Sequence, residues 1–195
     1  MSKAERTRQF IIEQAAPIFN RKGIAGTAMS DIMAATKMAK GGLYGNFESK
    51  EDLAYSIVDY NLQSLAAALV AAVAKGGTAK EKLFAYLDFF QSPVQFPVAG
   101  GCPILNFGVE ADDTDPVIKG KVKGLIEAAQ SVAATIIRQG IERGEFKATF
   151  DGRSFSILLF SALEGAVLIG RVLETNEQMG TVIGMMKKMI EAEFV

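Results

Sequence analysis

Residues 37–46 combine basic, hydroxyl, amide and glycine residues at spacings that suit contact with a nucleic acid. Lys40 and Tyr44 can donate hydrogen bonds to phosphate oxygens, and Asn46 can pair with an adenine base edge. The adjacent Gly41 and Gly42 would permit close approach to a base edge or to the sugar-phosphate backbone. The residues that a helix in the major groove would present here are Lys37, Met38, Lys40, Gly42, Tyr44 and Asn46.

Each of these residues also has a purely structural interpretation. Lys40 could be a solvated surface charge, and Tyr44 could be a core aromatic whose hydroxyl reaches water. Gly41 and Gly42 could merely loosen a helix. The two interpretations differ in a measurable way, because a contact residue can be replaced with little loss of stability whereas a core residue cannot.

Three helical patterns would position this segment. Apolar residues recur at helical spacing over residues 6–22, and Gly23 follows as a stop. Shorter helices are expected at about 28–35 and 39–45, which is the layout of a helix-turn-helix. The apolar residues expected to hold the three helices together are Ile11, Ala15, Phe19, Ile32 and Leu43.

Local signals set the expected helix ends. Pro17 predicts a kink in the first helix, or packing that compensates for one. Thr27 is the expected N-cap of the second helix, and Ser49 with Asp52 forms an acidic capping box that begins a long helix. Further helices are expected from Thr78 to about Ser92, near 104–110, from Asp115 to about Gly144, from Asp151 to about Leu173, and over 177–194.

Residues 6–53 resemble the DNA-binding head of TetR-family repressors without a gap. The resemblance is carried by RQFIIEQAAPIFNRKG at 8–23, TAMSDIMAA at 27–35 and KGGLYGNFESKEDL at 40–53. It implies a three-helix DNA-binding head, a homodimer and a divergent ligand-binding body. By position, it implies phosphate contacts by Thr27, Tyr44 and Lys50, and base-facing positions at Lys37, Met38, Ala39, Lys40 and Gly42.

Three positions depart from the family's usual pattern. Lys37 stands where the family usually has glycine, so a lysine must accept a less favourable backbone conformation. Ala39 stands where a serine often caps the recognition helix, a loss of about 1 kcal/mol. Gly42 stands where threonine or serine is usual. These departures affect the base contacts more than the fold.

The remainder of the chain reads as an apolar body with a candidate ligand cavity. Phenylalanines cluster around a proline- and glycine-containing loop at 93–103, although most of them could simply fill a core. Asn106 and Glu110, four residues apart, could anchor a polar ligand group or could cap helices or face solvent. Cys102 has no basic neighbour in the sequence, which favours a small buried hydrophobe over a reactive thiol. The expected ligand-binding residues are Phe84, Phe89, Phe96, Cys102, Asn106, Phe107, Glu110 and Phe155.

Two late helices are candidates for a dimer seam. The helix from Asp151 is apolar on more than one side, which indicates a helix shared between a core and a partner. With the last helix it could form a four-helix seam across a twofold axis, or the two could complete a monomer core. The expected interface residues are Phe155, Leu159, Ala162, Ala166, Ile169, Val182, Met186 and Met189.

Composition narrows the class of protein. Residues 1–50 hold eight Lys or Arg against four Asp or Glu, and the rest thirteen against eighteen, which suits a DNA reader with a separate body. The chain has no histidine, nucleophile elbow, phosphate loop or metal-ligand cluster, so we expect no enzyme, no catalytic or metal-binding residue and no cofactor. A single cysteine, no long apolar run and no signal-like N-terminus predict a soluble cytoplasmic protein.

These observations predict an all-α fold of about nine helices. A helix-turn-helix DNA-binding domain is expected over residues 1–48, and a ligand-binding and dimerisation domain over 49–195. The expected partners are double-stranded DNA with a near-palindromic operator, a second copy of the chain, and a small, largely apolar effector that releases a repressor from DNA. Two alternatives remain open, namely activation instead of repression and a helical structural adaptor without a ligand response.

Overall fold

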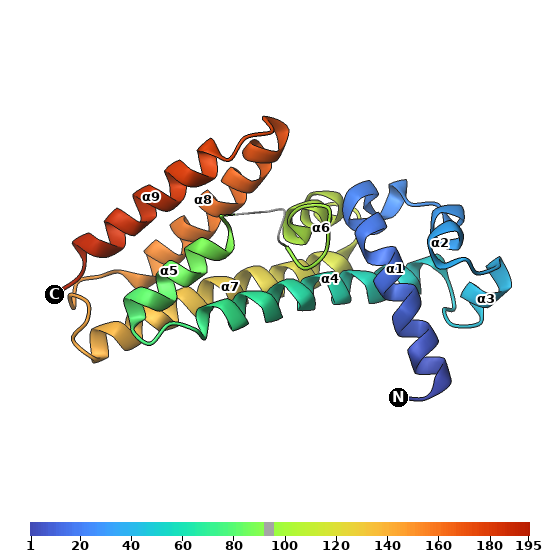
Figure 1. Cartoon of the computed structure of the whole chain (residues 1–195), viewed down its shortest axis with the longest axis horizontal. Coiled ribbons are helices and arrows are strands. Elements are labelled where there is room, and N and C mark those ends of the chain that lie inside the picture. The colour runs from blue at the N-terminus through green and yellow to red at the C-terminus, as the bar shows by residue number, and fades with distance from the viewer. Residues whose placement is uncertain (92–95) are drawn as a thin grey trace. The chain divides into compact units, whose positions relative to one another are not determined.

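The computed structural model describes residues 1–91 and 96–195, and within these residues it contains nine α-helices and no strand (Figure 1). The prediction of an all-α fold is therefore confirmed. The helices are α1 (Lys3–Gly26), α2 (Met29–Thr36), α3 (Lys40–Tyr44), α4 (Lys50–Val73), α5 (Ala79–Phe89), α6 (Pro103–Ala111), α7 (Pro116–Glu142), α8 (Gly152–Val172) and α9 (Glu177–Ala192).

The chain divides into two compact units. The first unit comprises Met1–Leu65 and Phe96–Lys123, and the second comprises Ala66–Gln95 and Gly124–Val195. This division groups α6 with the N-terminal helices, whereas the sequence suggested a functional boundary after residue 48. The expected helix end at Ser92 and the start of the expected loop at Pro93 lie outside the described residues.

Helix α1 begins with a complete capping box and passes through its proline. The Ser2 side chain accepts from the backbone amide of Glu5, and the Glu5 carboxylate accepts from that of Ser2. The non-helical backbone angles within α1 lie at Gly23, with φ 75°, and not at Pro17. A positive φ suits glycine, so the chain changes direction there instead of at the expected kink.

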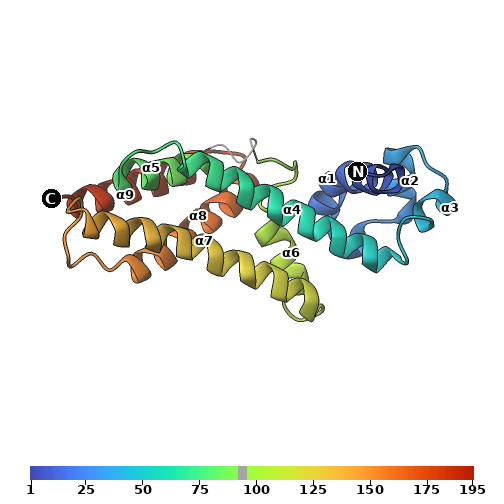
Figure 2. The same ribbon diagram turned by 90° about the horizontal axis from the view of Figure 1, so that it is seen from below.

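The apolar residues expected to hold the first three helices together are buried in the core of the first unit. Figures 1 and 2 show α1, α2 and α3 packed together near the N-terminal end of α4. Ile32 of α2 and Leu43 of α3 are both essentially inaccessible to solvent, as is Phe19 of α1. Burial of this interlocking set holds the two short helices, which would not be stable alone.

The second unit is a helical bundle in which α9 packs against both α8 and α5 (Figure 1). Thr78 caps α5 and Asp151 caps α8, as the sequence predicted. Edge-on contacts connect Phe146 with Phe150 and Phe150 with Phe155. Helices α4 and α8 are long and apolar enough to span a membrane by length and composition, a property that the core helices of soluble bundles share.

Candidate nucleic-acid interface

The turn between α2 and α3 depends on a residue in the left-handed conformation. Helix α2 ends at Thr36, and Lys37 follows with φ 58° and ψ 26°. The unfavourable backbone conformation predicted for Lys37 is therefore present. Ala39 begins α3 with extended angles and no side-chain capping bond, so the amides at that end have no hydroxyl cap.

Helix α3 presents a polar outer face over an apolar underside. Leu43 points inward and is 1% exposed, whereas Tyr44 is 42% exposed. The Lys40 ammonium lies 5.8 Å from the centre of the Tyr44 ring, so a cation and an aromatic hydroxyl share this face. The other exposed residues of the segment are Lys37, Ala39, Gly41 and Gly45, and Met38, Gly42 and Asn46 are half-buried.

Two contacts shape the turn from within. The buried Thr36 hydroxyl donates to the Ile32 carbonyl at 2.8 Å and accepts from the Met38 amide at 3.4 Å. A Cβ at Gly42 would lie 3.1 Å from the Met38 methyl carbon, so a side chain at 42 would require this methyl group to shift by a few tenths of an ångström. Glycine at this position therefore leaves the Met38 side chain in its place beside α3.

Thr27 supports the end of α1 instead of the start of α2. Its side chain is buried, and its hydroxyl donates to the Gly23 carbonyl at 2.6 Å. The N-cap of α2 is Ala28, whose amide donates to the Asp31 carboxylate at 3.0 Å. The prediction of Thr27 as N-cap is wrong, because α2 begins after Ala28 and the Thr27 hydroxyl donates to a carbonyl of α1.

The Asp31 carboxylate also accepts a hydrogen bond from Lys22. This bond, followed by that from Ala28, lowers the pKa of Asp31.

Lys50 lies in the first turn of α4 and binds the chain that leaves α1. Its ammonium donates to the Ile24 carbonyl at 2.9 Å, and its side chain is half-buried. This bond uses one of the three ammonium hydrogens, so the same group has donors for another acceptor. Ser49 and Asp52 cap α4 as expected, except that the Asp52 carboxylate reaches the amide of Glu48.

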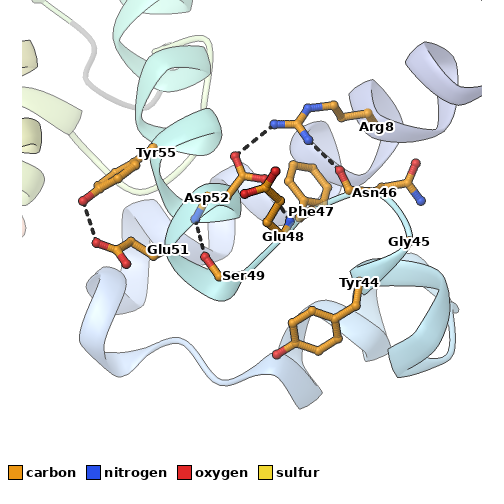
Figure 3. A pocket seen from close by; sticks show the side chains of 10 residues that line it. All are labelled: Arg8, Tyr44, Gly45, Asn46, Phe47, Glu48, Ser49, Glu51, Asp52 and Tyr55. Atoms are coloured by element: carbon orange, nitrogen blue, oxygen red, sulfur yellow. Dashed lines mark hydrogen bonds and ion pairs between the residues drawn. The ribbon is translucent and has the colours of Figure 1, made fainter.

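Arg8 is a positioning residue that sequence reasoning did not single out. Its guanidinium donates to the Asn46 carbonyl at 2.5 Å and to the Asp52 carboxylate at 3.3 Å (Figure 3). The same group lies 4.1 Å over the Phe47 ring and donates to the Ser56 hydroxyl. Arg8 thus ties α1 to the segment that follows α3. No local pattern could reveal this role, because its partners lie 38 to 48 residues away.

A polar groove of about 600 Å³ lies beside this cluster, between α1, the end of α3 and the first turns of α4 (Figure 3). The Tyr55 hydroxyl donates to Glu51 at 2.7 Å, and this bond, with burial second, raises the pKa of Tyr55 to about 12. Tyr55 therefore stays protonated near neutral pH and adds no negative charge near the interface. Asn46 donates its side-chain amide to the Gly42 carbonyl at 2.8 Å.

The residues expected to bind a ligand are divided between the two units. Phe84, Phe89 and Phe155 lie in the second unit, where the Lys80 and Lys187 ammonium groups lie 5.3 and 5.0 Å from the Phe84 ring. The residues that lie in the first unit are Phe96, Cys102, Asn106, Phe107 and Glu110. Cys102 is buried, in agreement with the expectation of a small core residue.

Asn106 and Glu110 bind protein groups in the structure. The Asn106 amide donates to the Asn20 carbonyl at 2.7 Å and to the Asn20 side-chain oxygen at 2.9 Å. Glu110 accepts from the amides of Ile24 and Ala25 at 2.7 and 2.6 Å. Their role as polar ligand anchors stays a prediction. The contacts of Glu110 with the two backbone amides of α1 favour the alternative in which it caps a helix.

The expected dimer residues also separate into two groups. Phe155, Leu159, Ala166 and Met186 are buried within the single chain, and Ala166 lines a groove between α8 and α9. Ile169 and Met189 are exposed, and Ala162 and Val182 are half-buried. The outward stripes are Leu158, Ala162, Gly165, Ile169 and Val172 on α8, and Val182, Met185 and Met189 on α9.

Together these features define the class of protein, a helix-turn-helix DNA-binding protein. Its recognition helix, α3, is polar and exposed on one face and packs against the core through the other. The comparisons agree. Residues 11–57 match the family described as bacterial regulatory proteins, tetR family, and residues 79–186 match the tetracyclin repressor-like C-terminal domain.

Solved structures of similar proteins cover essentially the whole chain. A TetR transcriptional regulator from Chloroflexus aurantiacus is 37% identical, with a TM-score of 0.94 over 100% of this chain and 98% of that one. A TetR-family regulator from Cytophaga hutchinsonii is 38% identical, with a TM-score of 0.91 over the same shares. The transcriptional repressor DhaR of Mycobacterium sp. strain GP1 is 25% identical over 90% of this chain and 89% of its own.

The chain belongs to the TetR family of transcription regulators. It is therefore a DNA-binding transcription regulator and not an enzyme, as the other members of this family are. Members of the family typically act as homodimers that respond to small molecules, and they are in general cytoplasmic. None of these relatives favours the structural adaptor that the sequence had left open.

Proposed function

We propose that a homodimer of this chain binds a near-palindromic operator, with α3 of each subunit in the major groove. The exposed face of α3 carries this proposal, because Lys40 and Tyr44 point outward while Leu43 fixes the helix from beneath. Thr27 is not in the proposed contact set, since its hydroxyl is bonded within α1. The proposed contact residues are Lys37, Met38, Ala39, Lys40, Gly42, Tyr44, Asn46 and Lys50.

The outward stripes of α8 and α9 are the proposed dimer surface. Between the two helices lies a groove of about 370 Å³ whose lining includes Ala162, Gly165, Ile169 and Val182. Small residues on α8 would let a partner helix approach closely, and the neighbouring aliphatic side chains would supply apolar area. Twofold pairing of these helices would hold two copies of α3 about one DNA turn apart.

The proposed effector is a small, largely apolar molecule that lowers DNA affinity by binding another arrangement of the body more tightly. Aromatic rings of the second unit support this class of ligand, with Phe89 against Phe90 and Phe150 against Phe155. Phe84, Phe89 and Phe155 remain the proposed lining residues there. Native mass spectrometry of the purified protein, before and after mild denaturation, would detect a co-purified molecule of this kind.

Substitution of α3 tests the DNA-contact proposal. Lys40→Ala should weaken binding to a duplex that the wild-type chain enriches from a randomised pool, and should lower the salt slope of log K by about 0.9 for one lost phosphate contact. Tyr44→Phe should weaken binding to the same duplex without a large shift in thermal midpoint. Lys75→Ala, an exposed lysine of the second unit, is the matched control and should change neither quantity. Equal losses of stability and binding would identify Lys40 and Tyr44 as structural.

A further inference from the structure

Helix α6 is held against α1 by two polar contacts, which lie four residues apart in the sequence of each helix. Asn106 binds Asn20, and Glu110 binds the backbone at Ile24, so the spacing of four residues on α6 matches the spacing of four on α1. Asn20 also donates its own amide to the Gly101 carbonyl at 3.0 Å. All of these contacts lie within the first unit, the unit that holds the DNA-reading helices.

The Glu110 carboxylate occupies a site that the backbone of α1 forms. The positive φ of Gly23 turns the chain so that the next two amides, those of Ile24 and Ala25, converge on the two carboxylate oxygens. A Cβ at Gly23 would lie 2.7 Å from a Glu110 oxygen, so any other residue type would force the carboxylate to shift, and the positive φ would strain its backbone. Bonds from backbone amides to an ionised carboxylate are among the stronger hydrogen bonds in proteins.

The peptide group between Ile24 and Ala25, called the Ile24 peptide below, connects this carboxylate to the proposed interface. Its amide, that of Ala25, donates to Glu110 at 2.6 Å, and its carbonyl, that of Ile24, accepts from the Lys50 ammonium at 2.9 Å. Residue 24 therefore bridges α6 and the first turn of α4. Displacement of the Ile24 peptide would move the acceptor that fixes the direction of the Lys50 side chain, which carries four rotatable bonds and is otherwise free to reorient.

We propose that Glu110 is a positioning residue for DNA binding: it holds the Ile24 peptide, and that peptide orients Lys50 toward a phosphate. The proposal rests on the proposed function, in which Lys50 contacts the DNA backbone. The positioning role and the negative charge of Glu110 predict opposite changes in DNA affinity when Glu110 is replaced. Loss of a negative charge should strengthen binding to DNA in general, whereas loss of the Glu110 bonds should weaken it.

A set of four variants separates geometry from charge. Glu110→Gln removes the charge and one acceptor, Glu110→Asp keeps the charge but shortens the reach, and Asp112→Asn removes an exposed charge two residues away. Affinity for the enriched duplex is measured by fluorescence anisotropy over a range of salt concentrations, alone and combined with Lys50→Ala. The thermal midpoint of each variant shows whether it is folded. If Glu110→Gln does not fold, Glu110→Asp still tests the proposal.

We expect both Glu110 variants to weaken binding by about tenfold, the effect of losing one hydrogen bond to a charged group, while Asp112→Asn leaves affinity equal or slightly higher. Lys50→Ala should cost less in the Glu110→Gln background than in the wild type, because the two act through one contact. If Lys50→Ala lowers the salt slope while both Glu110 variants behave as Asp112→Asn does, the positioning role is overturned and the Lys50 contact stands. If Lys50→Ala leaves the slope unchanged, the phosphate contact itself fails, and the positioning role fails with it.

Discussion

At the residue scale, Lys37 combines a conformational cost with a position facing the proposed DNA surface. A residue other than glycine in the left-handed region costs about 1–2 kcal/mol, and Lys37 is in that region with φ 58°. Its side chain is exposed, so burial of the stem does not offset this cost. Retention of a lysine where the turn favours glycine is consistent with a role for the charge in binding.

Replacement of Lys37 by glycine should therefore separate stability from binding. We expect Lys37→Gly to raise the free energy of unfolding by about 0.5–1 kcal/mol, since relief of the left-handed strain exceeds the entropy that glycine adds to the unfolded chain. Affinity for the enriched duplex should fall, with a smaller salt slope. Lys37→Ala is the control, because it removes the charge but keeps the strain. Urea denaturation measures the first quantity, and a stability of Lys37→Gly no higher than that of Lys37→Ala would contradict the argument.

Single residues also show which features local sequence can predict and which it cannot. The cap at Asp115 and the exposure of Lys40 follow from neighbours within a few residues, and each could be predicted. The unfavourable conformation of Lys37 was predicted from the family resemblance, because glycine is usual at that position. The spacing of Asn106 and Glu110 placed them correctly on one helix face. It could not reveal that this face meets α1, because the partners lie 85 to 86 residues away in the chain.

At the element scale, carboxylates accept hydrogen bonds from backbone amides at the starts of two helices of the second unit, α5 and α8. The Asp151 side chain accepts from the Ser154 hydroxyl at 2.7 Å and from the amides of Ser154 and Arg153. These bonds, the hydroxyl bond first, lower the pKa of Asp151 below its usual value of 3.8. Glu81 caps α5 in the same way, and bonds from the amides of Thr78 and Gly77 lower its pKa.

A lowered pKa gives these caps a definite dependence on pH. Because folding favours ionised Asp151, its stabilisation is present above pH 3.8 and is lost as the pH falls through the lower pKa of the folded state. Asp151→Asn can still cap α8 but cannot titrate. We expect the difference in unfolding free energy between wild type and Asp151→Asn to be largest near neutral pH and to shrink on acidification. Asp113→Asn, at an exposed position in the first unit, is the control. A difference that grows as the pH falls would show that the sign is wrong.

Helix α8 illustrates what periodicity leaves undetermined. The helix carries two apolar stripes, one with Phe155 and Leu159 and the other with Leu158 and Ile169. Helical spacing identifies both stripes, and neither is more apolar than the other by enough to indicate which one faces the core. Packing against α9 settles it, because Leu159 is fully buried and Ile169 is 47% exposed. The residues of the predicted seam therefore divide between the core of the single chain and its outer surface, although the helix itself was predicted correctly.

At the scale of the whole molecule, the exposed aliphatic residues of α8 indicate a surface that a partner covers. Val172 is 73% exposed and Leu168 is 53% exposed, and each lies near other exposed aliphatic residues. Single exposed apolar residues are ordinary, but contiguous ones on two adjacent helices mark an interaction surface. Twofold pairing through this surface would remove them from water.

Introduction of a charge into that stripe should dissociate the dimer and with it weaken operator binding. In Ile169→Glu, dimerisation would bury a carboxylate without a partner, a cost of several kcal/mol that should raise the dimer dissociation constant by at least about 100-fold. Val117→Glu places the same charge at a similarly exposed position, 46% exposed, on α7 of the first unit and should leave the dimer intact. Sedimentation equilibrium measures the dissociation constant, and anisotropy measures affinity for the enriched duplex. Because a monomer presents one α3 instead of two, Ile169→Glu should bind a half-site as weakly as the full operator. A dimeric Ile169→Glu would show that the subunits pair through another surface.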